Sequence, residues 1–298
     1  MRILLTGVTG QLGQELMPRL RELGEVFGAS RAECDLGSVP AIRSLVAAVQ
    51  PAVIVNAAAY TAVDEAEQQQ ELAYAINCKA AGVLADEARR WDAMLVHYST
   101  DYVFDGSKAE AYTEEDTTAP RNVYGASKLA GENAVCAAGG RSLVLRTSWV
   151  YGAKGKNFLQ TIRRLARERG ELKVVDDQVG APTSVMEIAR ATTELVRRCA
   201  GEETGKFPAG IYHMTAAGCV SWCGFARAIV AALRADEKLK LERIVPIPSA
   251  EYVTAARRPL NSRLNNDKFA DTFGFRLESW EQGLAEVVGE LRRREAQV

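Results

Sequence analysis

A glycine-rich turn close to the N-terminus places the strongest constraint on how this chain can fold. The sequence Gly7-Val8-Thr9-Gly10-Gln11-Leu12-Gly13 follows an apolar run and precedes an amphipathic stretch that reaches Leu23. A buried strand that turns through glycines into a helix is the phosphate-binding start of a dinucleotide-binding fold. Gly7 permits the tight turn, Gly10 lets the backbone approach a pyrophosphate, and Gly13 lets the helix pack against the strand. The turn, with Gln11 and Leu12, is therefore predicted to bind a cofactor.

Apolar, β-branched runs alternate with helical patterns through the first half of the chain. Strands are expected at residues 2–6, 25–29, 53–57, 94–99 and 143–147, and helices near residues 14–23, 39–48, 73–90 and 124–138. This alternation predicts an α/β fold, a Rossmann-type doubly wound parallel sheet. After residue 150 the pattern becomes irregular. We expect an NAD(P)-binding domain at 1–150, and at 151–298 mainly a smaller C-terminal α/β substrate-binding domain, from which some segments return to the first.

Composition excludes several classes of partner. The chain of 298 residues has 37 Lys and Arg against 38 Asp and Glu, so it lacks the basic field that nucleic acid binding requires. No apolar stretch is long enough to span a membrane, and no signal-peptide pattern follows Met1. Six scattered cysteines favour free thiols, and no further ligands complete a zinc site around Cys219 and Cys223. We therefore expect a cytoplasmic protein.

The segment Tyr124-Gly125-Ala126-Ser127-Lys128 is the second strong signal. Tyr and Lys four residues apart on a helix share one face, so the ammonium can approach the phenol. A neighbouring cation favours the phenolate and moves its pKa from near 10 towards neutrality. Behind a glycine turn at this separation, we expect both residues to be catalytic. Thr100 ends the fourth expected strand, where doubly wound sheets bind ligands, and it could polarise a substrate carbonyl or cap the next turn.

Several further motifs carry a family resemblance that runs through nearly the whole chain in order. The glycine turn, Tyr124–Lys128 and the segments at 56–59 and 99–104 resemble extended short-chain dehydrogenases/reductases. The segments at 59–64, 146–151, 177–183 and 257–262 are similar to those of dTDP-4-dehydrorhamnose reductases in particular. The resemblance implies reduction of the C4 keto group of dTDP-4-dehydro-β-L-rhamnose, the last step of dTDP-rhamnose biosynthesis.

The resemblance also implies roles for individual residues. Tyr124 would protonate the C4 alkoxide, Thr100 would polarise the carbonyl, and Lys128 would tune Tyr124 and hold the nicotinamide ribose. Cofactor contacts would include Ala57, Ala58, Ala59, Tyr60 and Thr61, with Asp35 and Leu36 bordering the adenine. The sugar pocket would be lined by Val63, Thr100, Asp101, Tyr102 and Trp149, although core filling stays an alternative for Trp149. Asn157 and Arg257 would meet the diphosphate, because amides and guanidinium groups suit phosphate oxygens.

Cofactor choice is indicated by the end of the second expected strand. NAD enzymes place an acidic residue there to bind the ribose 2′-hydroxyl. This chain has Ser30 and Arg31, which suit a 2′-phosphate better, although a plain surface charge is an alternative for Arg31. We expect NADPH to be preferred and NADH to be accepted as a second cofactor.

A metal-linked homodimer is left open by the sequence. Some members of the family dimerise around a magnesium ion held by acidic residues, and Glu15 matches the first of these positions. Met186 and Ser279 stand where the other two acidic residues are found. Glu187 and Glu278 lie one residue away, a shift that turns a helical side chain by about 100°.

Two other functions compete with the reductase. The first is a sister enzyme, an epimerase, a dehydratase or a reductase of another nucleotide-4-keto sugar. Dehydratases of this family carry Asp-Glu after the strand-end Thr, where this chain has Asp101-Tyr102. The second is a non-catalytic NADP-binding regulatory subunit, similar to that of methionine adenosyltransferase. A pure binding protein does not need Thr100, Tyr124 and Lys128 together, so their presence favours an enzyme.

Overall fold

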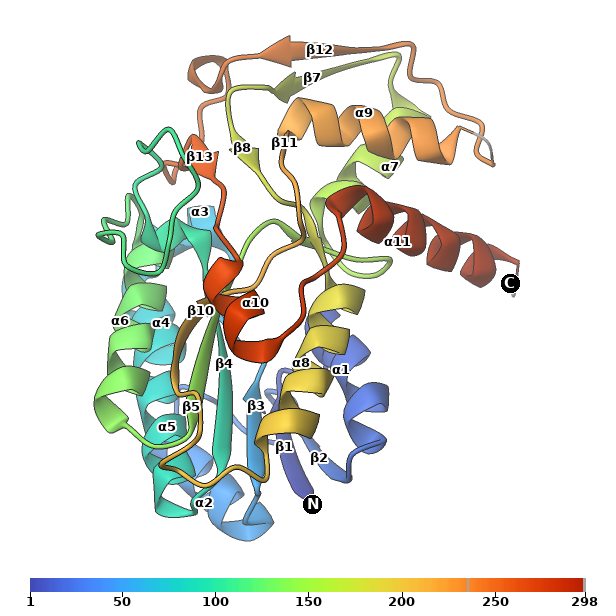
Figure 1. The fold of residues 1–298 in the computed structure, drawn as a ribbon. Helices are drawn as coiled ribbons and strands as arrows, with labels where there is room; N and C mark the ends of the chain where they lie inside the picture. The colour runs from blue at the N-terminus through green and yellow to red at the C-terminus, as the bar shows by residue number, and fades with distance from the viewer. Residues whose placement is uncertain (235, 297–298) are drawn as a thin grey trace.

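A six-stranded parallel sheet organises the protein, whose computed structural model describes residues 1–234 and 236–296 (Figure 1). From one edge to the other the strands are β10 (Gly210–His213), β5 (Ser142–Thr147), β4 (Met94–Thr100), β3 (Val53–Asn56), β1 (Arg2–Thr6) and β2 (Glu25–Ala29). All neighbouring pairs are parallel, which confirms the predicted doubly wound sheet. The chain reverses its direction of winding between β1 and β3, so ligands are expected at the carboxyl ends of these strands.

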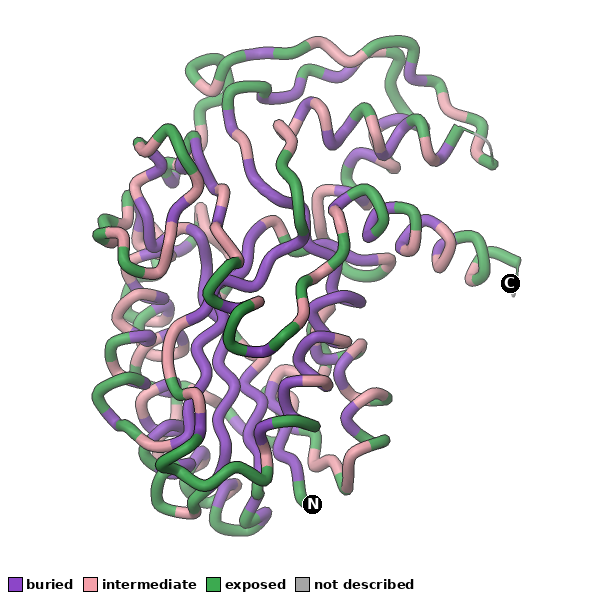
Figure 2. Tube along the Cα trace, in the orientation of Figure 1, coloured by how far each residue is buried: buried purple, intermediate pink, exposed green. Residues whose placement is uncertain are grey.

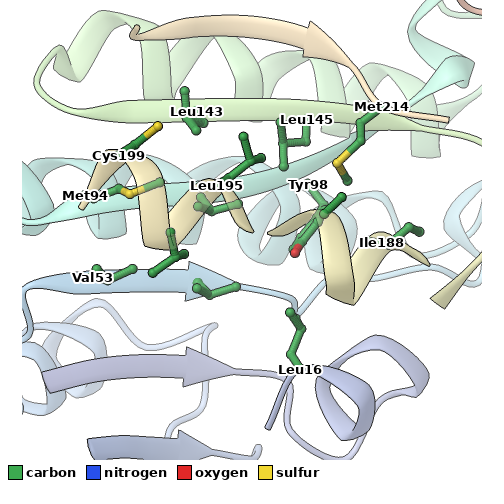
Figure 3. Close-up of a cluster of buried hydrophobic side chains, with 14 of the residues drawn as sticks. Leu16, Val53, Met94, Tyr98, Leu143, Leu145, Ile188, Leu195, Cys199 and Met214 are labelled. Carbon is green, nitrogen blue, oxygen red and sulfur yellow. The ribbon is translucent and has the colours of Figure 1, made fainter. Parts of the chain in front are cut away.

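Helices cover both faces of this sheet, and the central strands are buried along their length (Figure 2). Residues Leu4, Ile54 and Leu95 face α2 (Val39–Val49), α5 (Ala80–Arg90) and α6 (Val123–Ala138). The alternate residues face α1 (Gln11–Arg21), α8 (Val185–Cys199) and α10 (Asp267–Phe273), where Leu16, Ile188 and Leu195 meet the strands (Figure 3). Both faces are apolar because side chains alternate along a strand and each face is covered by helices.

The expected boundary at residue 150 does not divide the packing of the chain. Strand β10 joins the edge of the six-stranded sheet beside β5, and α8 and α10 contribute to the same core as β1 and β3. All three elements follow residue 150. These elements pack with the six-stranded sheet and its core.

One predicted helix is interrupted. Residues 73–90 were expected as a single helix, but α4 (Gln70–Tyr74) passes into a π-helical turn, η1 (Ala75–Lys79), before α5 begins. A π-bulge inserts one residue into the helical repeat and redirects the side chains beside it. Here the bulge contains Asn77, which is buried.

The second part of the protein has a core of its own. Helices α7 (Phe158–Glu168), α9 (Trp222–Leu233) and α11 (Trp280–Glu295) pack together with the strand pair β7 (Glu171–Val175) and β12 (Arg243–Ile247). The shorter strands are β6 (Val150–Tyr151) with β9 (Thr183–Ser184), and β8 (Val179–Gly180) between β11 (Val220–Ser221) and β13 (Asn261–Ser262).

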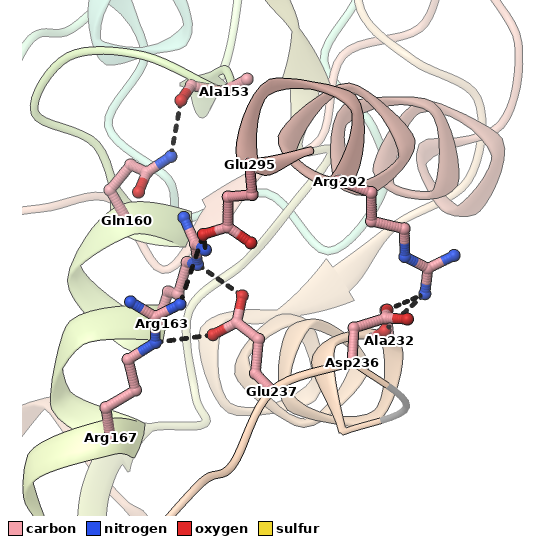
Figure 4. Close-up of polar contacts among 9 residues, drawn as sticks. All are labelled: Ala153, Gln160, Arg163, Arg167, Ala232, Asp236, Glu237, Arg292 and Glu295. Carbon is pink, nitrogen blue, oxygen red and sulfur yellow. Dashed lines mark hydrogen bonds and ion pairs between the residues drawn. The ribbon is translucent and has the colours of Figure 1, made fainter. Parts of the chain in front are cut away.

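Ion pairs join the ends of these three helices (Figure 4). Glu237, whose side chain is 6% exposed, accepts from Arg163 at 2.6 Å and from Arg167 at 2.7 Å, and Arg292 of α11 pairs with Asp236 at 2.5 Å. Buried carboxylates need such partners, so these pairs specify how the helix ends meet. Within residues 1–234 and 236–296, no helix combines the length and the apolarity that a bilayer crossing demands.

Candidate active site

The glycine turn lies at the carboxyl end of β1, where the sheet reverses. Gly7 has φ +71°, and a Cβ there would lie 2.7 Å from the backbone nitrogen of Ala58, so the turn packs directly on the Ala57–Ala59 segment after β3. A side chain at Gly13 would collide with the Gly7 carbonyl, which confirms close packing of α1 on the turn. The first amides of α1 have no helical partners and its positive dipole end faces the turn. The turn therefore fits a pyrophosphate.

A buried polar row crosses the sheet from the turn to α6, which carries Tyr124 and Lys128. The strand register sets Thr6 beside Asn56 and Asn56 beside His97. Thr6 donates to Asn56 at 2.6 Å, and the Asn56 amide lies 3.0 Å from His97 Nδ1. The His97 Nε2 in turn lies 3.5 Å from Lys128 Nζ. Burial, and then the charge of Lys128, hold the pKa of His97 well below its ordinary range, so a neutral imidazole faces the ammonium.

Tyr124 and Lys128 lie on the first two turns of α6, where Tyr124 is half-buried and Lys128 is buried. Burial raises the pKa of Tyr124 to about 12, while hydrogen bonding with Thr100 acts against this shift. The lowering of this pKa that we expected from Lys128 is not found, since Thr100 is the group that acts against burial. The Lys128 ammonium donates to the carbonyl oxygen of Tyr98 at 2.5 Å, and burial lowers its own pKa to about 8. Tyr124 is therefore held as a neutral phenol, the form that can donate a proton.

Thr100 and Asp101 bring further oxygen atoms to Tyr124. Thr100 Oγ1 donates to Asp101 Oδ1 at 3.1 Å and accepts the backbone N–H of Tyr102 at 3.2 Å, so it both caps the turn η2 (Asp101–Val103) and reaches the phenol. Burial raises the pKa of Asp101 to about 7. Its Oδ2 is buried without a hydrogen-bond partner among the described residues. The ring of Tyr102 meets Tyr124 edge-on, with centroids 5.8 Å apart.

The loop after β3 is held by a residue that the sequence analysis missed. Asn77, in the π-helical turn, accepts the N–H of Tyr60 at 2.8 Å and donates to its carbonyl at 3.0 Å. The same amide lies 3.0 Å from Ser127 Oγ on α6. Asn77 thus ties the predicted cofactor loop to α6. This loop continues to Thr61 and to Val63 at the start of α3 (Val63–Ala66).

Trp149 occupies a strained position rather than a simple core position. Its φ is +48°, a left-handed conformation that costs energy in a residue with a side chain. The half-buried indole stacks on Trp222 of α9 with centroids 3.5 Å apart and an interplanar angle of 7°. The absence of a side chain at Gly180 makes room for this ring. The stack joins the end of the main sheet to the second core.

The two residues predicted to contact the diphosphate differ in how far their side chains are already hydrogen-bonded within the protein. Asn157 caps α7 by accepting the N–H of Gln160 at 3.0 Å, and its amide donates to Gln11 at 2.7 Å and to the Gly152 carbonyl at 2.9 Å. Its hydrogen-bonding capacity is used within the protein, so its structure supports a role in positioning α7 against the glycine turn. The side chain of Arg257 is exposed, and only its carbonyl is engaged, by Asn122 at 2.7 Å.

The end of β2 contains an acidic group that the sequence analysis did not consider. Glu33 accepts the backbone N–H of Ser30 at 2.8 Å and also binds the Ser30 hydroxyl, so its carboxylate lies beside the predicted 2′-phosphate position. Arg31 and Asp35 are exposed, and Leu36 is half-buried. The sequence contained a signal for Glu33, because a tight turn after a strand brings the residue three positions later back to the end of that strand.

Comparison with known proteins decides the family. The family model described as RmlD substrate binding domain matches residues 1–293. A dTDP-4-dehydrorhamnose reductase of Burkholderia thailandensis is 49% identical over 295 residues, covering 98% of this chain and 99% of that protein. The chain belongs to the dTDP-4-dehydrorhamnose reductase family. The corresponding reductase of Escherichia coli K12 is 42% identical over 296 residues, covering 98% of each chain.

A solved structure of the same family has a matching fold. The dTDP-4-dehydrorhamnose reductase of Bacillus anthracis in complex with NADP superimposes with a TM-score of 0.89 at 35% identity, covering 97% of this chain and 99% of that one. The match over nearly the full length of both chains confirms the Rossmann-type fold and the resemblance drawn from the motifs.

Of the acidic residues considered for a magnesium site between two protomers, Glu187 is engaged within its own protomer. Glu187 is buried and accepts the backbone N–H of Glu278 at 2.9 Å, and Ser279 caps α11. Glu15 is half-buried on α1. Among the residues that the structure describes, no three His, Cys, Asp or Glu side chains gather as a metal site. We derive no metal-dependent step.

Proposed function

We propose that the protein reduces the C4 keto group of dTDP-4-dehydro-β-L-rhamnose to give dTDP-β-L-rhamnose, with NADPH as the preferred reductant. The observation that carries this proposal is the placement of a half-buried Tyr124, held as a neutral phenol, beside Thr100, at the sheet edge that also holds the glycine turn. Membership of the reductase family supports the substrate. Because its six cysteines are free thiols, we also propose that the protein works in the reducing cytoplasm.

The chemistry of the site follows from the protonation states of its residues. The reduced nicotinamide, when bound, supplies the hydride that reaches C4. Tyr124 then gives its phenolic proton to the oxygen that was the C4 carbonyl, which yields the alcohol and a phenolate. The buried Lys128 ammonium stabilises negative charge nearby and holds the ribose.

The test of this function is turnover of the named substrate. The wild-type protein is mixed with dTDP-4-dehydrorhamnose made in situ, loss of reduced-nicotinamide absorbance is followed with NADPH and with NADH, and the product is identified by NMR. We expect dTDP-rhamnose in stoichiometric yield. Binding of NADPH without turnover would refute the reductase and favour a regulatory subunit. Faster turnover of another nucleotide-4-keto sugar would replace the substrate.

Glu33 is expected to moderate the preference for NADPH. Its carboxylate stands where a 2′-phosphate would approach Ser30, so removing the charge by Glu33→Gln should raise the ratio of kcat/KM for NADPH over NADH by about threefold to tenfold. Arg31→Gln should change the same ratio in the opposite direction. Steady-state kinetics with both cofactors measure the ratio. An unchanged ratio in Glu33→Gln would show that this carboxylate does not face the cofactor.

The lowered pKa of Lys128 predicts an alkaline limit to activity. Because burial brings this pKa to about 8, the ammonium is present below that pH and is lost as the pH rises through it. We therefore expect kcat/KM to fall with increasing pH above about 8, by tenfold for each further pH unit. Lys128→Arg keeps a charge at these pH values and should remove the fall while lowering the plateau. A wild-type profile that stays flat through this range would contradict the assignment.

A further inference from the structure

An irregular segment, residues 252–260, crosses from the second part of the protein to the first, and we call it the strap. It connects the turn η3 (Ser249–Glu251) to β13. Its end passes Gly106, whose φ is +75° and where a Cβ would lie 2.6 Å from Pro259 Cα. The Gly106 carbonyl accepts the N–H of Asn261 at 3.3 Å. The loop after β4 therefore receives the strap at close range.

Asp64 of α3 holds the middle of the strap. Arg258 Nη2 donates to Asp64 Oδ2 at 2.7 Å, and the backbone N–H of Ala256 donates to Asp64 Oδ1 at 3.0 Å. The same guanidinium reaches back to the Ala256 carbonyl at 3.2 Å. One carboxylate thus restrains two residues of the strap. The side chains of Asp64 and Arg258 are 44% and 23% exposed, so the pair contributes little to global stability.

The residue between these two anchors is tied to the catalytic helix. Asn122, 7% exposed, donates to the Arg257 carbonyl at 2.7 Å and accepts the N–H of Gly125 at 2.7 Å, which caps α6 two residues before Tyr124. Glu67, directly after α3, accepts the N–H of Val123 at 2.8 Å. The strap, α3 and the start of α6 are therefore connected through three consecutive strap residues, Ala256–Arg258.

The ion pair also influences Tyr102, one of the residues expected to line the sugar pocket. The charge of Arg258 counteracts part of the rise that burial causes in the pKa of Tyr102. The ring of Tyr102 meets the ring of Tyr124 edge-on. Tyr102 is therefore the one residue that separates the Asp64–Arg258 ion pair from the proposed proton donor. Arg257, held between Ala256 and Arg258, keeps an exposed guanidinium that has no ion pair among the described residues.

We propose that the Asp64–Arg258 ion pair positions the strap so that the free guanidinium of Arg257 meets the diphosphate of the nucleotide sugar. Asp64 is thereby a positioning residue for substrate binding, and it has no part in proton transfer or in binding the nicotinamide cofactor. The inference rests on the proposed function, because it requires a diphosphate-bearing substrate.

The experiment compares Asp64→Asn with the wild type. Asparagine keeps an acceptor for Ala256 but removes the charge that holds Arg258. We expect KM for the nucleotide sugar and Kd for dTDP to rise by about tenfold, because the strap must then be ordered by the ligand. We expect kcat and the Kd for NADPH to change by less than about twofold. Asp267→Asn is the matched control, since Asp267 pairs with Arg276 at the same 2.7 Å on α10, away from the strap.

A double-mutant cycle separates the ion pair from a general loss of structure. Arg258→Gln should match Asp64→Asn, and the double variant should be no worse than either single variant, because both remove one interaction. A fall in Tm with unchanged KM, or an equal rise in the Kd for NADPH, would overturn the proposal. So would an unchanged Kd for dTDP in Asp64→Asn. Absence of turnover in the wild type, by contrast, would refute the proposed function, and a wild type that binds no dTDP would refute both.

Discussion

Tyr124→Phe is expected to lower kcat by about 10³-fold while leaving the Kd for NADPH nearly unchanged. Burial raises the pKa of this phenol to about 12, so at neutral pH it carries the proton that the C4 oxygen needs. Phenylalanine keeps the ring that packs edge-on against Tyr102 and removes only the hydroxyl. Single-turnover kinetics with NADPH and the keto sugar measure the chemical step directly.

Thr100→Val provides the matched control for this prediction. It removes the hydroxyl that hydrogen-bonds Tyr124 and Asp101 but leaves the proton donor in place, so we expect a smaller loss, about 10-fold to 10²-fold. Turnover of Tyr124→Phe within about tenfold of the wild type would show that another group supplies the proton. Asp101 would then be the first residue to test, because its pKa of about 7 leaves it partly protonated at neutral pH.

Glu132→Leu is expected to destabilise the protein by about 3–5 kcal/mol. Glu132 on α6 binds Arg146 of β5 through both oxygens, at 2.9 and 2.7 Å, and the two side chains are only 0% and 3% exposed. The variant would leave a buried guanidinium that contacts only the Phe104 ring and His213. Urea unfolding measures the change in the free energy of unfolding.

The double variant Glu132→Leu/Arg146→Met should regain most of that stability, because it removes both charges and keeps apolar volume. Glu168→Gln is a second control. Glu168 pairs with Arg164 at 2.8 Å, but both side chains are more than half exposed, so we expect a change below about 1 kcal/mol. A loss in Glu132→Leu as small as that of Glu168→Gln would mean that Arg146 finds another partner. Because α6 carries Tyr124 and Lys128, the pair also maintains the position of the catalytic helix.

Local sequence patterns predicted the fold, and they single out the candidate reacting groups, because both depend on short-range signals. The glycine turn and the Tyr124–Lys128 spacing each occupy a few consecutive residues, and the buried strands appear as continuous apolar runs. The alternation of these strands with helices was sufficient to predict a parallel sheet.

The supporting contacts could not be predicted in the same way. The π-helical turn places Asn77 against Ser127, and a regular helical repeat contains no sign of that insertion. The row from Thr6 to His97 depends on strand register, and the ion pair of Asp64 joins residues 194 positions apart. Burial, which raises the pKa of Tyr124, is likewise a property of the packed structure.

The core of the six-stranded sheet, which we call the first core, includes elements that lie late in the sequence, and this affects synthesis of the chain. Leu143 and Leu145 of β5 are covered by residues such as Leu195, Met214 and Phe269, which belong to α8, the end of β10 and α10. A nascent chain that has emerged only to residue 150 therefore exposes one apolar face of its sheet. The first core is completed only after most of the chain has emerged, and until then the exposed apolar face favours aggregation and chaperone binding.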